Sequence, residues 1–171
     1  MEFQSNYSYF IESLSKDNVF FKQLLSMDCA SKKPPLLLLN RKLYPNILFR
    51  LSYYFFNSSF PFLSYIPYLL NELIYGVTIS PRTKISGGFF LPHPHGVIIG
   101  AKFIGENVII FQNVTIGASK LDLSSDFSRR PVIENNVTIY PCAGIYGHLT
   151  IRSNSVVPSN HVVTKDFPPL S

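Results

Sequence analysis

The chain has 171 residues, 46% of them hydrophobic, and its 15 Lys and Arg against 10 Asp and Glu give a formal net charge of +5. That length and apolar content suit one folded domain with an appended element. The basic residues are scattered along the chain, without runs or repeated basic-aromatic blocks. The composition therefore argues against a nucleic-acid-binding protein.

The N-terminus and the cysteines indicate a reducing compartment. The first residues, Met-Glu-Phe-Gln-Ser-Asn, lack the basic leader and apolar stretch of a secretion signal. Cys29 and Cys142 lie far apart and form no CxxC pair, so neither a zinc knuckle nor a disulfide framework is indicated. We expect a cytoplasmic protein.

Residues 1–75 are expected to form a helical N-terminal region. Apolar residues recur there at helix-like separations, as in Phe20, Phe21, Leu24 and Leu25. The apolar stretch 34–75 contains charged residues and prolines, so it offers no clean span of about 20 apolar residues for crossing a membrane. We expect these helices to pack on the main domain or on sister subunits, with peripheral membrane contact as the alternative.

After Gly76 the apolar pattern changes to a period of six residues. Thirteen aliphatic residues follow this step in three groups, which are Ile79, Ile85 and Leu91; Ile98, Ile104, Ile110 and Ile116; and Ile133, Ile139, Ile145, Ile151, Val157 and Val163. A six-residue period is the signature of a hexapeptide β-helix, in which each hexad makes one short strand and one corner of a triangular coil. We predict an all-β left-handed parallel β-helix over residues 76–166, with these side chains inward and a short tail at 167–171.

A second regularity has the same phase. The residue three after the aliphatic one is Gly or Asn in six hexads, at Gly88, Asn107, Asn113, Asn136, Asn154 and Asn160. Gly and Asn best tolerate the positive φ that the corners of such a coil need. The turn residues and the aliphatic stack therefore predict the same fold.

The repeat is interrupted twice, and function is expected at these interruptions because insertions leave the stacked core undisturbed. The step from Leu91 to Ile98 is seven residues and contains Pro-His-Pro-His-Gly, and the step from Ile116 to Ile133 is seventeen. The extra residues of the second interruption predict a polar loop over 117–130 that projects from the coil toward a neighbouring subunit.

The first interruption contains His93 and His95 between prolines. Histidine suits general-base chemistry because its unperturbed pKa lies near neutrality. His93 is therefore a candidate base, and a polar corner residue without a catalytic role is the alternative.

At these residues the sequence resembles the serine O-acetyltransferase branch of the hexapeptide-repeat acyltransferases, over about residues 75–169. The resemblance is carried by Gly-Val-Thr-Ile-Ser-Pro-Arg-Thr-Lys-Ile-Ser-Gly-Gly at 76–88, by Leu-Pro-His-Pro-His-Gly-Val-Ile-Ile-Gly at 91–100 and by Asn-Val-Thr-Ile-Gly at 113–117. It selects His93 as the catalytic histidine, and His95 is the second candidate.

The resemblance implies an acetyl-CoA-dependent O-acetyltransferase that forms a homotrimer, with active sites between adjacent subunits and no metal. It places CoA beside four small residues, which are Gly117, Ala118, Ala143 and Ser159. Arg129 and Arg130 are the candidate substrate-binding residues, since Arg129-Arg130-Pro131 matches an Arg-His-Pro of the family.

Three departures from the family pattern concern the acceptor. Thr78 stands where the family has the aspartate that orients the catalytic histidine, Pro92 replaces the acid before that histidine, and Arg130 replaces a second histidine. The helical region is also shorter than that of a typical serine acetyltransferase. The Leu-Pro-His-Pro motif and the aromatic-rich N-terminal region look more like relatives from polysaccharide clusters. We therefore expect a surface-glycan hydroxyl as acceptor, with serine O-acetylation for cysteine biosynthesis as the alternative.

Two remote alternatives use the same coil. A trimeric carbonic anhydrase would hold zinc with His93, His95 and His148, and a non-catalytic scaffold would fit the loss of acids at Thr78 and Pro92. Cys142 is expected to be a structural corner residue and no acyl carrier.

Overall fold

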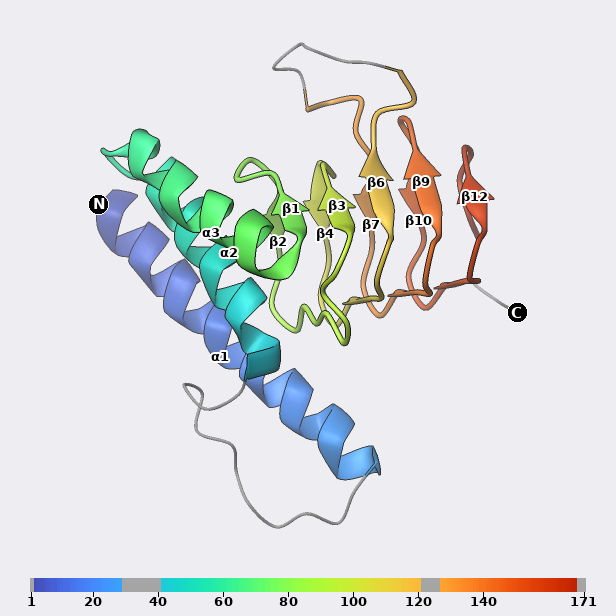
Figure 1. Cartoon of the computed structure of the whole chain (residues 1–171), viewed down its shortest axis with the longest axis horizontal. Helices are drawn as coiled ribbons and strands as arrows, with labels where there is room; N and C mark the ends of the chain where they lie inside the picture. The colour runs from blue at the N-terminus through green and yellow to red at the C-terminus, as the bar shows by residue number, and fades with distance from the viewer. Residues whose placement is uncertain (1, 29–40, 121–126, 169–171) are drawn as a thin grey trace.

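The computed structural model describes residues 2–28, 41–120 and 127–168. Three helices lie against one end of a coil of short strands (Figure 1). The helices are α1 (Glu2–Asp28), α2 (Tyr44–Phe56) and α3 (Tyr65–Tyr75), with short 3₁₀ turns at Arg41–Leu43 and Pro61–Ser64. None of the helices described is long and apolar enough to cross a membrane.

The chain passes from the α-helical region to the β-helix at a single residue. Gly76 ends α3 with a left-handed φ of 63°, and its N–H donates to the carbonyl of Glu72 at 2.9 Å. This is the usual way in which a glycine terminates a helix, because it has no Cβ to clash in that conformation. The first strand begins at the next residue.

Twelve strands of two or three residues form the coil. They are β1 (Val77–Ile79), β2 (Lys84–Ile85), β3 (Val97–Ile99), β4 (Phe103–Ile104), β5 (Ile109–Ile110), β6 (Thr115–Gly117), β7 (Val132–Ile133), β8 (Thr138–Ile139), β9 (Gly144–Tyr146), β10 (Thr150–Ile151), β11 (Val156–Val157) and β12 (Val162–Val163). They make three parallel sheets, which we call sheet A (β1-β3-β6-β9-β12), sheet B (β10-β7-β4-β2) and sheet C (β11-β8-β5). The chain visits A, B and C in turn, so the predicted triangular coil of left-handed parallel β-helix is confirmed.

Twelve of the thirteen predicted aliphatic residues are buried, each at most 4% exposed. The prediction is wrong for the thirteenth, Ile98, whose side chain is 49% exposed. Its neighbour Ile99 is buried instead, at 1% exposure. Ile99 pairs with Ile79 on one side and Ile116 on the other. Two adjacent isoleucines look alike to a spacing argument, and only the strand register shows which one faces inward.

The corner residues adopt the predicted conformation. Each of the five asparagines has a φ between 57° and 62°, and Gly88 has a φ of 79°. Cys142 occupies the same kind of corner, with a φ of 62°. Some corners are also linked from coil to coil, since Asn107 Nδ2 donates to Asn136 Oδ1, and Asn136 Nδ2 to Asn154 Oδ1, both at 3.2 Å.

A buried ion pair joins the helices to the coil. Arg50 of α2 and Asp17 of α1 are each 1% exposed and lie 3.1 Å apart. Arg50 also donates to the carbonyls of Ile85 and Ser86, and the Asp17 carboxylate accepts the Phe89 N–H at 2.9 Å. Buried charges are tolerated only when they are paired and hydrogen-bonded, as these are.

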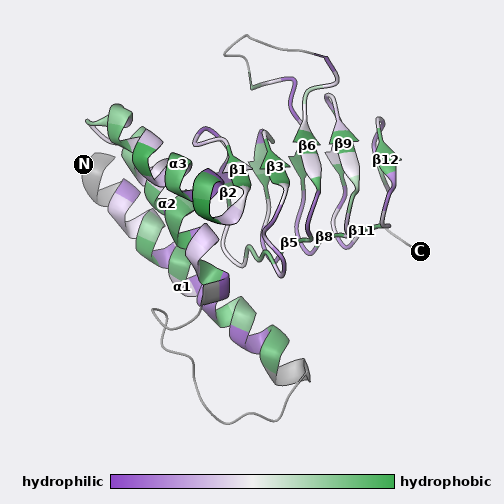
Figure 2. Ribbon diagram, viewed as in Figure 1, coloured by the Kyte–Doolittle hydropathy of each residue, from purple (hydrophilic) through white to green (hydrophobic). Residues whose placement is uncertain are grey.

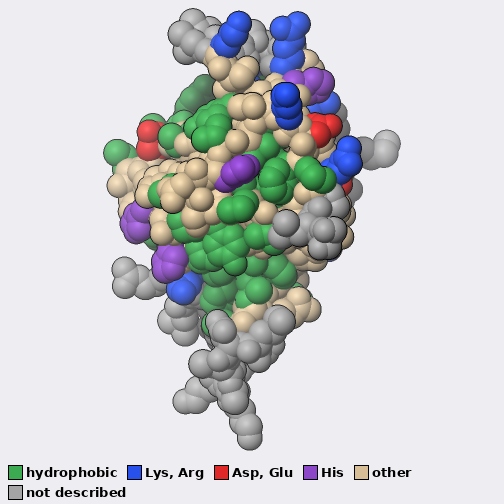
Figure 3. All heavy atoms as spheres, turned by 90° about the vertical axis from the view of Figure 1, so that its right-hand side faces the viewer, with side chains coloured by type: hydrophobic (Ala, Val, Ile, Leu, Met, Phe, Trp, Pro, Cys, Tyr) green, Lys and Arg blue, Asp and Glu red, His purple; other side chains and the backbone are tan. Residues whose placement is uncertain are grey.

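Apolar side chains also reach the outside of the molecule. α2 and α3 are hydrophobic along most of their length, whereas α1 alternates (Figure 2). The free end of the coil, which faces the viewer in Figure 3, shows a broad hydrophobic area with Lys and Arg gathered toward one rim. Beyond the last strand, Phe167 forms a bridge to Ile151.

Candidate active site

A groove of about 640 Å³ lies on the outer face of sheet A. It is formed where the strands of this sheet end, beneath the described ends of the 117–130 loop and beside α2 and α3. Its lining residues are Phe56, Tyr65, Tyr68, Thr78, Ser80, Pro81, Arg82, Ile98, Ile99, Gly100, Thr115, Ile116, Gly117, Ala118, Lys120, Phe127, Arg130 and Tyr146. Volumes of this order are typical of small-molecule sites.

The guanidinium of Arg130 lies beside two glycines. Gly100 and Gly117 follow paired residues of β3 and β6, and a Cβ on either would be in ordinary van der Waals contact with Arg130 Nη1, at 3.5 Å or 3.8 Å. The same guanidinium lies 5.3 Å from the centroid of the Phe127 ring, within cation–π range. The side chain of Arg130 is thereby placed over the ends of two strands of sheet A.

The charged groups that line the groove are all cationic. They are Arg82, Lys120 and Arg130, and no Asp or Glu is among the described lining residues. The remaining polar lining consists mostly of hydroxyl groups. Burial raises the pKa of the Tyr68 hydroxyl above its usual 10.0, with smaller contributions from Glu72 and Tyr65, so this phenol is a hydrogen-bond donor at neutral pH.

His93 and His95 lie in the turn between sheet C and the start of β3, and both are exposed. Backbone hydrogen bonds hold this turn in register with its neighbours: the Gly96 N–H donates to the Gly76 carbonyl and the Asn113 N–H to the His95 carbonyl, both at 3.0 Å. Gly96 has a φ of 70°, which a residue with a side chain rarely adopts.

Aromatic rings line up along the same corner of the coil. The His93 ring lies 6.4 Å from the Phe111 ring, and Phe111 stacks on Tyr140 at 5.2 Å. This row gives His93 an apolar neighbour on one side while leaving the imidazole open to solvent.

The histidines and the groove are not brought together within one chain. Neither His93 nor His95 lines the groove. The histidine turn precedes β3, whereas the groove covers the outer face of sheet A, with Thr78, Ile98 and Thr115 in its lining, and the turns that follow these strands.

The four residues proposed to contact CoA are also divided. Gly117 and Ala118 line the groove, whereas Ala143 is buried at 1% before β9 and Ser159 is exposed in the turn before β12. Ala143 and Ser159 therefore lie near the edge of sheet A where the histidine turn is.

The other predicted site residues are divided between the groove and the exposed surface. Arg130 and Thr78 line the groove, and Arg129 is exposed outside it. The described ends of the loop, 117–120 and 127–130, border the groove, while its centre at 121–126 falls outside the described residues. Cys142, His148 and His161 are exposed.

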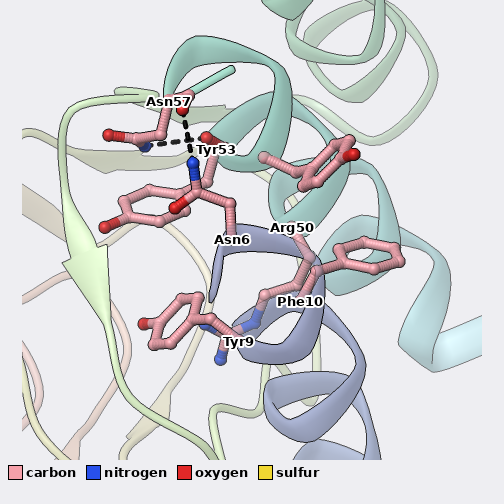
Figure 4. A pocket seen from close by; sticks show the side chains of 7 residues that line it. Asn6, Tyr9, Phe10, Arg50, Tyr53 and Asn57 are labelled. Carbon is pink, nitrogen blue, oxygen red and sulfur yellow. Dashed lines mark hydrogen bonds between the residues drawn. The ribbon is translucent and has the colours of Figure 1, made fainter. Parts of the chain in front are cut away.

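Metal-ligating side chains and a crevice between helices are the two other features that bear on ligand binding. Within a single chain, the described residues include no group of three His, Cys, Asp or Glu side chains that could hold a metal ion. The crevice between α1 and α2, lined by Tyr9, Arg50 and Tyr53 among others, is drawn in Figure 4. Its interior leaves ≈ 0 Å³ for a water molecule, and Asn6 closes it with a bond from Nδ2 to the Asn57 carbonyl at 2.5 Å. This crevice is therefore a packing contact between α1 and α2 and leaves no space for a ligand.

The sequence analysis missed Arg82 and Phe127. Both guanidiniums of the groove approach the Phe127 ring, and Arg82 also lies 5.9 Å from the Phe56 ring. The available signal was position: Arg82 occupies the corner after β1, which lies two coils from the predicted loop after β6.

The chain is similar in sequence to serine acetyltransferases. It is 33% identical over 136 residues to a plasmid-encoded serine acetyltransferase of Synechococcus elongatus, covering 73% of this chain and 43% of that protein. It is 35% identical over 124 residues to the serine acetyltransferase of Buchnera aphidicola, covering 71% and 46%. The chain thus spans about half the length of these curated relatives. No family model matches it.

Solved structures of serine acetyltransferases share the fold of this chain. A serine acetyltransferase from Neisseria gonorrhoeae superposes with a TM-score of 0.81 at 25% identity, covering 95% of this chain and 62% of that one. One from Vibrio cholerae superposes with a TM-score of 0.80 at 23% identity, covering 94% and 60%. The shared region includes the N-terminal helices as well as the coil.

These comparisons correct the expectation about the acceptor. A glycan hydroxyl is the wrong acceptor class, because the relatives and the structures alike are serine acetyltransferases. The short helical region and the replaced acids did not justify moving the chain to polysaccharide-cluster enzymes, since substitutions at single site positions are compatible with the parent fold. The chain is a hexapeptide-repeat protein with the left-handed parallel β-helix fold of the serine acetyltransferase structures.

Proposed function

We propose that the chain is an acetyl-CoA-dependent O-acetyltransferase that acts on the hydroxyl of serine, with His93 as general base. The observation that carries the proposal is the similarity to serine acetyltransferases over about 70% of the chain, together with a proline-flanked histidine at the interruption of the repeat. The exposed imidazole is accessible to a substrate.

The reaction needs one proton transfer and one acyl transfer. His93 takes the proton of the acceptor hydroxyl as the oxygen attacks the thioester carbonyl carbon. Backbone N–H groups are suited to stabilise the resulting oxyanion. The carbon–sulfur bond then breaks, CoA leaves as the thiolate, and the proton on His93 passes to the sulfur or to water. No acyl-enzyme is required.

The groove suits the acyl donor. CoA is a long polyanion, and the groove combines the small residues Gly117 and Ala118 with three cationic side chains. One of the superposed serine acetyltransferase structures is a complex with CoA, at a TM-score of 0.79. We place the donor along sheet A on this basis.

The position of the base suits a site shared between subunits. Because His93 does not line the groove of its own chain, we propose a homotrimer in which the His93 turn of one subunit faces the groove of the next. A cyclic, heterologous arrangement brings two different surfaces together and closes as a ring.

Thiol release from acetyl-CoA tests the activity. Wild-type chain with L-serine should release CoA, and His93→Ala should lower the rate by about 10²–10⁴-fold, the usual contribution of a positioned base. His95→Ala should do less, and His148→Ala, which removes another exposed histidine, should leave the rate unchanged. An active His93→Ala beside an inactive His95→Ala would exchange the two roles, and two fully active variants would exclude a histidine base.

Subunit complementation tests the assembly. Co-expressed His93→Ala and Arg130→Ala chains form mixed trimers in which some sites combine an intact base with an intact groove. These preparations should regain a substantial part of the wild-type rate, although each variant alone is impaired. A mixture no more active than its components, or a monomer by light scattering, would contradict the shared site.

A further inference from the structure

A buried oxygen without a partner lies in the corner of the coil next to the histidine turn. Oε1 of Gln112 is buried, and it accepts no hydrogen bond from any residue that the structure describes. Buried polar atoms of native proteins are nearly always hydrogen-bonded, so this atom calls for a donor. Because the oxygen is shielded from solvent, the side chains around it are the first source of that donor.

The backbone places His95 and Gln112 at the same position of neighbouring coils. The Asn113 N–H donates to the His95 carbonyl at 3.0 Å, just as the Cys142 N–H donates to the Gln112 carbonyl at 3.1 Å. The residue at this position in the coil on the other side is Pro141, which precedes Cys142. A proline has no N–H and no polar side chain. Of the two neighbours of Gln112 along this corner, only His95 therefore offers a donor.

The residue before Gln112 lies beside the other histidine. The Phe111 ring is 6.4 Å from the ring of His93, so two consecutive residues of this corner are matched with the two histidines of the corner before it. Pro94 separates the histidines. A proline fixes its own φ and restricts the residue before it to extended conformations. A constraint on His95 therefore also limits the backbone of His93.

We propose that Gln112 is a positioning residue of the histidine turn, and that its side-chain oxygen accepts an N–H from the imidazole of His95. The bond requires a rotation of the His95 side chain, which is exposed. An acceptor at one ring nitrogen fixes the tautomer and the orientation of an imidazole. His95 thereby anchors the turn, and His93 keeps its own ring free to take a proton. The inference rests on the proposed function for the role of His93.

NMR of the full chain, with its 4 histidines labelled with nitrogen-15, tests the bond without using turnover. With neutral imidazoles, His95 should show a single tautomer, whereas the exposed ring of His148 should show an average of two. Gln112→Met keeps the approximate shape of the side chain but removes the amide, so His95 should become averaged. Gln112→Glu retains an acceptor oxygen and should keep the single tautomer. Lys102→Met, an exposed change at another corner of the same coil, is the control and should leave His95 unchanged.

A double-mutant cycle tests the effect of the bond on the reaction. Gln112→Met and His95→Ala should each lower kcat by about 3- to 10-fold, the loss expected for one hydrogen bond, with an unchanged KM for acetyl-CoA. The double variant should be no slower than either single variant, because both changes remove the same bond. Gln112→Glu should restore kcat. A role in packing alone predicts the opposite order, with methionine tolerated and glutamate harmful.

Three results would overturn the proposed bond. They are a wild-type His95 ring that averages as His148 does, a single tautomer at His93 instead, and a Gln112→Glu variant no better than Gln112→Met. Additive losses of kcat in the double variant would also contradict it. If the tautomer of His95 responds as expected but the wild-type chain acetylates no serine, the bond is supported and only the proposed function fails.

Discussion

The helical region and the coil of this protein are stabilised in different ways. In the coil, each aliphatic residue of the repeat has an equivalent one coil above or below it, and twelve of the predicted thirteen are nearly inaccessible. The helices have no such repetition and are attached to the coil through a few specific contacts, chief among them the ion pair of Asp17 and Arg50. A repeating core spreads stability over many similar residues, whereas a junction of this kind depends on single ones.

The largest expected effect is therefore at the junction. Arg50→Ala should lower the free energy of unfolding by about 3–5 kcal/mol, because it leaves the Asp17 carboxylate buried without its partner. Lys16→Ala removes an exposed ion-pair residue from α1, 3.0 Å from Glu12 and 3.3 Å from Glu106, and should lower the free energy of unfolding far less, because solvent screens exposed ion pairs. Urea unfolding monitored by circular dichroism measures both, and equal losses would show that burial of the pair is unimportant.

A pair of neighbouring isoleucines tests the register of the coil. Ile99→Ala should cost about 2–5 kcal/mol, since it opens a cavity in the stack, and Ile98→Ala about 0.5 kcal/mol or less, as for other exposed positions. Urea denaturation of the two variants gives the comparison directly. The reverse order would show that Ile98 faces inward, as the six-residue step from Ile98 to Ile104 predicts.

The corners should be less sensitive than the core. Asn136→Ala places at a φ of 57° a residue that tolerates this conformation less well than asparagine, whose short polar side chain can hydrogen-bond locally, and should cost about 1–2 kcal/mol. Asn136→Gly keeps the backbone conformation but loses both hydrogen bonds of the side chain, so its loss should be smaller. Thermal unfolding compares the two, and equal losses would place the stabilisation of this corner in the Asn–Asn hydrogen bonds, which both variants lack.

The smallest effect concerns pH. The N–H and hydroxyl of Ser153 donate to Glu134 and hold the pKa of its carboxyl below the usual 4.5. A lowered carboxyl pKa stabilises the fold above the unfolded value, and that contribution is lost as the pH falls through the lowered one. The stability difference between wild type and Glu134→Gln should therefore disappear below this range. Ser153→Ala should raise the Glu134 pKa in an NMR titration, and an unchanged pKa would refute the cause.

The acceptor shows a limit of sequence reasoning at single positions. The inference from Thr78, Pro92 and Arg130, as departures from the family pattern, to a glycan acceptor was wrong. A replaced residue shows that one contact has changed, but it does not name the molecule that makes the contact. The similarity over the whole coil was the stronger evidence.

The sequence by itself determined the coil, its corners and the histidine turn, because a six-residue period is a local property that repeats many times. It could not choose between Ile98 and Ile99, which only the pairing with β1 and β6 decided. Nor could it find the Asp17–Arg50 pair, whose members are 33 residues apart, or the meeting of Arg82 with Arg130 at Phe127. Each of those depends on segments that no periodicity relates: the first is brought together by the packing of α1 on α2, and the second by the stacking of coils, which places the corner after β1 near the end of the loop after β6.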